Sequence, residues 1–388
     1  MRNISKEEFE MKKILAILLI IASLFILSSC KNKAEYPPVE STEEEASTVM
    51  TLSIDGTTYD VKYELYRAFF LTYKSQVDGG DPSVWTSDNS DEYIEKIDRI
   101  IINRVAEIYA AFAMCEKIGF DIYSNDVEKK IKENIRISVE GGNYGSYTIE
   151  GFESYDDYLA ALKAMNLNYS VQTLLLRYAI AVDAIDTYYI GTVSSDDVDI
   201  NMTDGAIEYT KDDVKEFYDS DDCVRVLRAS FHKAISSKPL ERAEKLKATL
   251  ENAANSKDTL EEKEEAVIIA IMGNSLYTNV AEIKEGYVIG KYNLERSYYG
   301  DMTDAAFSLE VGEVSAPVDV VTDVENSYYV IYRSFKSDEH FENNYESIKY
   351  IYLTNCVGEM SHGVAEELKN NVEYTDFLKN IDHSGIGM

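Results

Sequence analysis

The sequence predicts two folded domains of different class, an all-α domain followed by an α+β domain. Between Asp91 and Tyr189 the apolar residues recur by threes and fours, which is the period of a buried helix stripe. From Cys223 onward, β-rich and helical segments follow in the order strand, helix, helix, strand, short helix, strand, which is typical of an α+β domain. The 388 residues leave room for two or three modest domains beyond a leader and linker.

The first thirty residues predict an export signal. A basic stretch, Met11-Lys12-Lys13, precedes an apolar run, Ile14 to Leu27, which suits a secretory signal and is too short to span a bilayer. The run ends in Leu27-Ser28-Ser29-Cys30, which resembles the bacterial lipobox, whose cysteine is acylated before the signal is removed. We therefore expect residues 1–30 to be a lipoprotein signal peptide and Cys30 to be the lipid-modified N-terminus. The alternative is an ordinary signal peptide with an incidental cysteine.

A linker is predicted over residues 31–50. This segment is rich in Glu, Ser and Lys, contains Pro37-Pro38 and lacks apolar periodicity. Such a composition buries too little apolar surface to offset the entropy of ordering, so we expect a flexible tether.

The all-α domain is predicted over residues 51–221. A short strand, turn and return strand at 52–59 precede a helix at 61–74, and the strongest helix signal runs from Asp91 to Ile118. Three further helices are predicted from their N-cap residues, Ser124, Ser154 and Ser170, and a last short helix follows Thr210. The acidic stretch Ser194–Gly205 is expected to be a loop.

The α+β domain is predicted over residues 222–337. Strands are expected at 224–235, 287–290, 314–321 and 328–333, and helices at 241–254, 259–272 and 304–309. A C-terminal helical segment, residues 338–388, contains a long helix at 340–371 that we expect to return to the first domain.

Composition argues against several classes of site and partner. Lys and Arg number 38 against 70 Asp and Glu, and the net charge of −32 disfavours nucleic acid and anionic lipid. Besides Cys30, the cysteines are Cys115, Cys223 and Cys356, and no two have metal-binding or redox-motif spacing. The four histidines form no pair at ligand spacing, and no phosphate-binding glycine loop is present. We therefore expect no metal and no cofactor.

The order of several short motifs resembles the N-terminal domain of SurA-like and PrsA-like chaperones. These motifs are Ile54-Asp55-Gly56, the stretch from Lys117 to Ser124, Tyr158-Leu159 with Met165-Asn166-Leu167, and the stretch from Thr210 to Tyr218. The following segment resembles a parvulin, the peptidyl-prolyl isomerase domain that those chaperones carry. Its most specific motif runs from Ala305 to Val318, and glycines near 286–292 and 300–302 stand where the family has glycine-rich turns.

The chain departs from the parvulin pattern at the positions that matter for activity. The resemblance implies one histidine on the first strand and one on the last, facing each other beside a cysteine or aspartate and an apolar proline pocket. Here the last-strand position is Tyr329. The first-strand position is Arg228 or Phe231, depending on the alignment, and His232 fits only after a one-residue slip, which changes the face of a strand. Neither Cys nor Asp falls at the third position.

These observations lead to the hypothesis of a membrane-anchored, extracytoplasmic chaperone or foldase. Its partners would be unfolded or partly folded secreted polypeptides, and its parvulin-like domain would have lost catalysis. The alternatives are an active peptidyl-prolyl isomerase that uses Tyr329 and His232, and a solute-binding or scaffold lipoprotein. A solute-binding protein would require repeated βαβ units, and the long helical run from Asp91 to Tyr189 argues against them.

Overall fold

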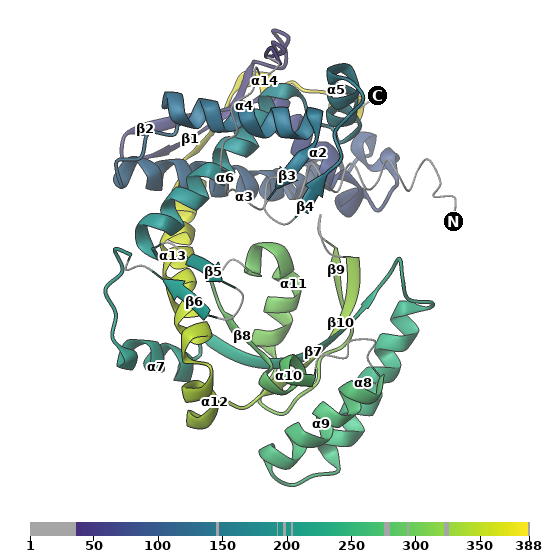
Figure 1. Ribbon diagram of the computed structural model, residues 1–388. Coiled ribbons are helices and arrows are strands. Elements are labelled where there is room, and N and C mark those ends of the chain that lie inside the picture. The colour runs from purple at the N-terminus through teal and green to yellow at the C-terminus, as the bar shows by residue number, and fades with distance from the viewer. Residues whose placement is uncertain are drawn as a thin grey trace. The chain divides into compact units, whose positions relative to one another are not determined.

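The computed structural model describes residues 36–144, 147–191, 193–196, 199–202, 205–274, 280–292, 295–321 and 326–386. The predicted signal peptide and Cys30 lie outside this range. The described chain divides into two compact units, one made of the residues up to Ile185 together with those from Ser361, and the other of Asp186–Met360. Both are mostly helical with small antiparallel sheets (Figure 1).

Five long helices form most of the first unit. They are α2 (Tyr63–Asp78), α3 (Ser90–Lys117), α4 (Asn125–Glu140), α5 (Tyr155–Ala164) and α6 (Tyr169–Tyr189), with the short 3-10 helix η1 (Pro82–Thr86) between α2 and α3. The stripe predicted for α3 is confirmed, because Ile97, Ile101, Val105, Ile108 and Phe112 are all buried. The unit boundary falls inside α6 and again inside α13 (Tyr345–Lys369).

Two of the three predicted N-caps in this unit are confirmed. The hydroxyl of Ser124 accepts a hydrogen bond from the amide of Val127, and that of Ser154 accepts from Asp157. The prediction for Ser170 is wrong. Helix α6 begins at Tyr169, so Ser170 lies inside it. The side chain of Asn168 accepts from the amide of Val171, and the Ser170 hydroxyl donates to Glu64 instead.

The first unit is mostly helical, and the hairpin predicted at 52–59 is confirmed, but it contains more β-structure than the expected all-α class. Strands β1 (Thr48–Ile54) and β2 (Thr57–Lys62) form a hairpin, and β11 (Val372–Tyr374) pairs with β1 on its other side. Asp55 and Gly56 make the hairpin turn at φ of 50° and 83°, where glycine is favoured. Strands β3 (Gly142–Tyr144) and β4 (Tyr147–Ile149) form a second hairpin.

The C-terminal residues complete this unit. After β11 the chain forms α14 (Asp376–Lys379) and the 3-10 helix η2 (His383–Gly385). His383 is buried, and its Nε2 lies 3.0 Å from the hydroxyl of Tyr66. The predicted C-terminal helix is interrupted, because α12 (Asp338–Asn343) ends before α13 begins at Tyr345.

The prediction of a flexible tether over residues 31–50 does not hold for its described part. Strand β1 already begins at Thr48. Residues 36–47, called the strap below, are hydrogen-bonded to helices of the first unit. The composition of this segment did not predict its ordered structure, because polar groups and the ring of Tyr36, rather than an apolar stripe, hold it to the first unit.

The second unit is built on the antiparallel sheet β8-β7-β10-β9. Its strands are β7 (Cys223–His232), β8 (Tyr287–Gly290), β9 (Val318–Val321) and β10 (Asn326–Ser334). Helices α8 (Pro239–Asn255) and α9 (Leu260–Asn274) cover one face, to which α10 (Val280–Glu285) adds Ile283, and α11 (Glu295–Ser308) covers the other. The predicted strands and helices are thus found, but α11 begins earlier than expected, and Gly300 lies in this helix rather than in a turn.

Residues between the predicted domains belong to the second unit. Helix α7 (Lys211–Asp219) packs its buried Val214, Phe217 and Tyr218 with Cys223, Phe341 and Ile348, so the boundary lies earlier than the predicted residue 221. Thr210 and Asp213 form a capping box at its start, as predicted for Thr210. The expected loop at 194–205 contains the hairpin of β5 (Val193–Asp196) and β6 (Asp199–Met202).

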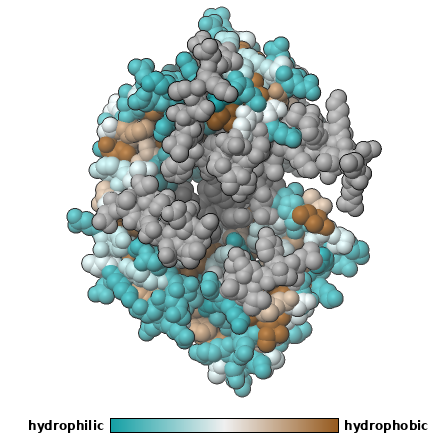
Figure 2. Space-filling view, viewed as in Figure 1, coloured by the Kyte–Doolittle hydropathy of each residue, from teal (hydrophilic) through white to brown (hydrophobic). Residues whose placement is uncertain are grey.

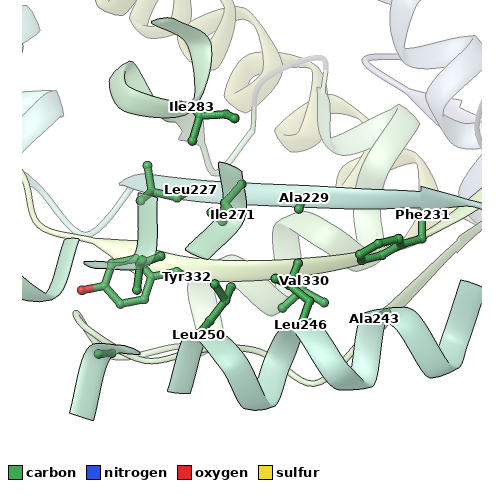
Figure 3. Packing of buried hydrophobic residues seen from close by; sticks show 12 residues of the cluster. Leu227, Ala229, Phe231, Ala243, Leu246, Leu250, Ile271, Ile283, Val330 and Tyr332 are labelled. Carbon is green, nitrogen blue, oxygen red and sulfur yellow. The ribbon is translucent and has the colours of Figure 1, made fainter. Parts of the chain in front are cut away.

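The two faces of the sheet carry separate hydrophobic clusters. Leu227, Ala229 and Phe231 of β7 point to α8 and α9 together with Val330 and Tyr332 of β10 (Figure 3). Val224 and Val226 point to α11 together with Ile331 and Tyr329. Side chains alternate along a strand, so this division assigns every residue of β7 and β10 to a face.

Candidate functional site

The face of β7 and β10 that packs against α11 holds three of the candidate residues from the sequence, Arg228, His232 and Tyr329. Ser230 pairs with Tyr329, Arg228 with Ile331, and His232 with Ser327. Alternation along the strands places Arg228, Ser230 and His232 on this face with Tyr329. The residue directly opposite Tyr329 is therefore Ser230, which the sequence alignments did not select.

Arg228 fills the centre of this face. Its guanidinium carbon lies 3.7 Å from the ring centroid of Tyr287 on β8 and 5.7 Å from that of Tyr329. One of its nitrogens lies 3.4 Å from the sulfur of Met302 on α11. Stacking of this kind contributes about 0.5–2 kcal/mol and leaves a cation in contact with two aromatic rings.

Tyr329 is part of the hydrophobic cluster beneath α11. The side chain is 5% exposed and packs with Met302, Ala306 and Val320. On the neighbouring strand β9, Val318 is its paired residue. The tyrosine ring is thus a packed element of this hydrophobic cluster.

His232 lies at the end of β7, two residue pairs beyond Tyr329. Its Nδ1 accepts a hydrogen bond of 3.2 Å from the amide of Ala234, so the imidazole closes the turn that leaves the strand. Its paired residue Ser327 is 1% exposed. Among the described residues, no second histidine shares this face of the sheet.

Phe231 lies on the opposite face and does not join Tyr329. It is 2% exposed and packs against α8 (Figure 3). The guanidinium carbon of Arg242 lies 5.1 Å from its ring centroid. The alignment that selected Phe231 is therefore wrong by one residue, which exchanges the faces of a strand.

The Ala305–Val318 motif positions α11 over this face. The Arg333 guanidinium donates to the carbonyl groups of Phe307 and Leu309 at 3.3 and 2.8 Å, which gives acceptors at the C-terminal end of α11 a cationic partner. Ser315 binds the backbone of Ile331 through its amide and its hydroxyl, at 2.8 and 3.0 Å. Ala306 is fully buried between the helix and the sheet. The motif thus has a structural role, which is to hold α11 against β10, and this role requires no catalytic activity.

The described cysteines are not prepared for nucleophilic chemistry. Burial raises the pKa of the Cys223 thiol and that of the Cys115 thiol to about 12. The pKa of Cys356 is also raised, mainly by burial. Since the thiolate is the reactive form, all three thiols are weak nucleophiles at neutral pH.

His340 belongs to a buried cluster at the other end of β7. Its Nδ1 lies 2.9 Å from the hydroxyl of Tyr218, and its Nε2 lies 2.8 Å from the carbonyl oxygen of Glu285. Burial lowers the pKa of His340 to about 4, so the ring is neutral at physiological pH. The imidazole joins α7, α12 and the end of α10.

No group of three potential metal ligands occurs within the described ranges. In the same part of the chain, no helix has both the length and the apolar character needed to cross a bilayer.

Comparison with known proteins finds similarity in solved structures alone. No protein-family model and no curated protein matches the chain. The foldase protein PrsA from Streptococcus pneumoniae is 14% identical and is matched over 85% of this chain and 97% of its own, with a TM-score of 0.26. PrsA from Lactococcus lactis is 16% identical over 88% and 100%, with a TM-score of 0.23. PrsA from Bacillus subtilis is 14% identical over 84% and 93%, with a TM-score of 0.22.

Proposed function

We propose that this chain is a membrane-anchored, extracytoplasmic chaperone that assists the folding of secreted proteins. An acyl group on Cys30 would hold it at the outer face of the membrane. Its second unit would bind unfolded or partly folded polypeptide on a parvulin-like frame without catalysing proline isomerisation.

The pairing of β7 with β10 carries this proposal. The parvulin resemblance implies that the first and last strands of the domain face each other, and these two strands are paired over eight residues. The facing side chains at the expected level are Ser230 and Tyr329 rather than two histidines. The pairing of β7 with β10 therefore supports a relationship to a polypeptide-binding domain, and the facing residues Ser230 and Tyr329 support a loss of catalysis.

The chemistry of the reaction supports the same conclusion. Rotation about a peptide bond has a barrier of about 20 kcal/mol, and an isomerase lowers it by holding the twisted amide in an apolar pocket with matched hydrogen bonds. Here the guanidinium of Arg228 stacks on Tyr287 at 3.7 Å, on the face of the sheet that also carries Tyr329. A proline ring entering this site would have to displace the stacked cation.

A second surface of the same unit is suited to contact with unfolded chains. Ile235, between β7 and α8, is 78% exposed, and Leu240, in the first turn of α8, is 43% exposed. Leu240 and Tyr328 line an open depression together with Lys233 and Lys238. Figure 2 shows that such hydrophobic areas are scattered over a mostly hydrophilic face. Small apolar contacts within a charged surface permit weak, reversible binding and keep the carrier soluble.

Suppression of client aggregation tests the proposal. We expect the protein, lacking its signal peptide, to reduce light scattering from a chemically unfolded client at equimolar ratio. The double variant Ile235→Ser/Leu240→Ser should lose much of this effect. The matched control Ile269→Ser, which removes a side chain that is 63% exposed on α9, should retain it. No suppression by the unaltered protein would refute the chaperone proposal.

Residual isomerase activity is the second candidate, because Tyr329 is the residue opposite Ser230 and a tyrosine hydroxyl can offer one hydrogen bond to a twisted amide. A proline-limited refolding assay separates the two candidates. We expect no acceleration above the uncatalysed rate. A clear acceleration that disappears in Tyr329→Phe would establish catalysis and contradict our proposal.

The structure gives no support to a solute-binding lipoprotein. All strand pairs in the described part of the chain are antiparallel, whereas repeated βαβ units require parallel neighbours. Tight, saturable binding of a small solute would be needed to revive this alternative.

A further inference from the structure

The strap is attached to the first unit from its first described residue. The ring of Tyr36 packs against that of Tyr155 on α5, with centroids 5.2 Å apart, and its hydroxyl donates to Glu140 at the end of α4 at 3.0 Å. The hydroxyl of Tyr155 in turn donates to the carbonyl oxygen of Pro37 at 2.7 Å. Two hydrogen bonds and one aromatic pair therefore hold the strap to the adjoining ends of α4 and α5, called the α4–α5 corner below.

Further along, the strap serves as the cap of α2. The first amides of a helix have no partner within it, and here the amides of Tyr63 and Glu64 donate to the carbonyl groups of Ser47 and Glu45 at 2.8 and 3.0 Å. The hydroxyl of Ser41 donates to the Glu64 carboxylate. That carboxylate also accepts hydrogen bonds from Asn168 and Ser170. The strap is thus fixed at both ends and near its middle.

The length of chain before the strap limits how far the first unit can move from an anchor. Residues 31–35 are the only ones between Cys30 and Tyr36. Six Cα–Cα steps span at most about 20 Å even when fully extended. A linker that was free up to residue 50 would instead permit about 70 Å by the same measure.

From this reach we infer that the α4–α5 corner is held directly at the outer surface of the membrane. The inference rests on the proposed acylation of Cys30. The first unit is then oriented by its strap, with Tyr36 and Tyr155 within about 20 Å of the lipid headgroups. The partner surface is the headgroup layer of the leaflet that holds the acyl chain.

The negative charge of the α4–α5 corner indicates that the corner lies close to the membrane surface without inserting into the lipid. Glu133, Glu140, Glu153, Asp156 and Asp157 surround it, and Arg136 is already paired with two of these carboxylates, at 2.7 Å from Glu133 and 2.6 Å from Glu140. An acidic surface has no attraction for anionic lipid, so the covalent tether and not adhesion sets the distance. Vesicles of neutral phosphatidylcholine should therefore be sufficient.

Energy transfer to the membrane surface tests the inference. The full chain is produced as an acylated protein, with Asp156→Cys carrying a donor dye and Cys356 replaced by Ser, and is inserted into phosphatidylcholine vesicles that contain a headgroup-labelled acceptor. Asp156 is exposed and lies next to Tyr155, whereas Cys115 and Cys223 are buried. We expect strong transfer from this position.

Two variants lengthen the reach in different ways. Tyr36→Ala/Tyr155→Phe removes both hydrogen bonds and the ring pair, so that the next attachment is Ser41 and the maximal reach rises to about 37 Å. An insertion of about ten Gly/Ser residues between Glu35 and Tyr36 lengthens the chain and leaves the strap attached. Transfer should fall severalfold in both variants and stay unchanged in the control Tyr123→Phe.

Each outcome decides a different claim. Equal transfer in the original chain and both variants would overturn the inference, even when mass spectrometry shows the acyl group. Absence of the acyl group would overturn the anchoring proposal as well as the inference. A loss of transfer in the insertion variant alone would show that the strap remains attached without its tyrosines, and would contradict their role as the fastening.

Discussion

Replacing Asp98 by Asn is expected to stabilise the first unit at pH 7.5 by about 1–2 kcal/mol. The Asp98 carboxyl is mostly buried on α3 and accepts a hydrogen bond of 2.7 Å from the hydroxyl of Tyr66. The same hydroxyl lies 3.0 Å from Nε2 of His383. Burial raises the pKa of Asp98 from 3.8 to about 6, whereas the hydrogen bond from Tyr66 opposes this shift.

The magnitude follows from that pKa. Holding a carboxyl at about 6 instead of 3.8 means that its ionised form costs the folded state up to about 3 kcal/mol at neutral pH. Asparagine removes the charge and still offers an oxygen to Tyr66. Its neutral hydrogen bond is weaker than the one to a carboxylate by about 1 kcal/mol, which reduces the expected gain.

The pH dependence has two opposing contributions. Because the pKa of Asp98 is raised on folding, its contribution is fully present below pH 3.8 and is lost as the pH rises through 6. Burial lowers the pKa of His383 below 6.5, so its contribution is present above pH 6.5 and is lost as the pH falls. The two slopes partly cancel in the original chain. In Asp98→Asn the His383 contribution remains, and stability should rise as the pH is raised towards 6.5.

Urea unfolding followed by tryptophan fluorescence measures this directly. Trp85 is the only tryptophan of the chain, is 4% exposed, and packs 5.0 Å from Phe70 in the same unit. The control is Asp91→Asn, which removes an exposed acid from the first turn of the same helix and should destabilise slightly. A lower stability of Asp98→Asn at pH 7.5, or an unchanged pH profile, would refute the reasoning.

Two further predictions concern the second unit. Arg225→Met should destabilise it by about 3–5 kcal/mol in urea titration, because the Glu264 carboxylate, 12% exposed and 2.9 Å from Arg225, loses its cation. The more accessible pair of Lys247 and Glu251, 32% and 41% exposed, provides the control Lys247→Met, with an effect below about 1 kcal/mol. Similar losses in the two variants would contradict the argument. Gly358→Ala on α13 should destabilise by about 1–3 kcal/mol, because a Cβ there would lie 1.6 Å from the carbonyl oxygen of Tyr292. Gly363→Ala on the same helix meets no atom within 4 Å and should stabilise by about 0.5–1 kcal/mol. Thermal unfolding of both variants measures the contrast, and equal shifts in melting temperature would show that the close approach at Gly358 is relaxed in solution.

Local signals in the sequence were sufficient for most helices. The stripe of α3 and the caps at Ser124, Ser154 and Thr210 each depend on residues within one or two turns, and all were found. Pairings between distant segments were not visible. Strand β11 is three residues long and becomes a strand only because β1 offers it an edge.

Only those features of the candidate site that depend on local sequence could be predicted. Tyr329 could be placed on the last strand from its β-rich surroundings, and Arg228 does share its face. Ser230 was missed because the facing partner depends on register, and nothing within β7 marks which residue lies opposite Tyr329. The contact between Arg228 and Tyr287 joins two strands whose separation along the chain hides it from any local pattern.

The return of the C-terminal segment to β1 has a consequence for the order in which the chain matures. The second unit is a continuous piece of chain, Asp186–Met360, and can fold as soon as that piece has been synthesised. The first unit starts earlier and is completed later, because β1 lacks β11, and Tyr66 lacks His383, until the residues after Met360 arrive. During synthesis, the first unit is therefore incomplete for a time: the edge of β1 is unpaired and Tyr66 lacks its contact with His383. In that interval the protein is itself partly folded.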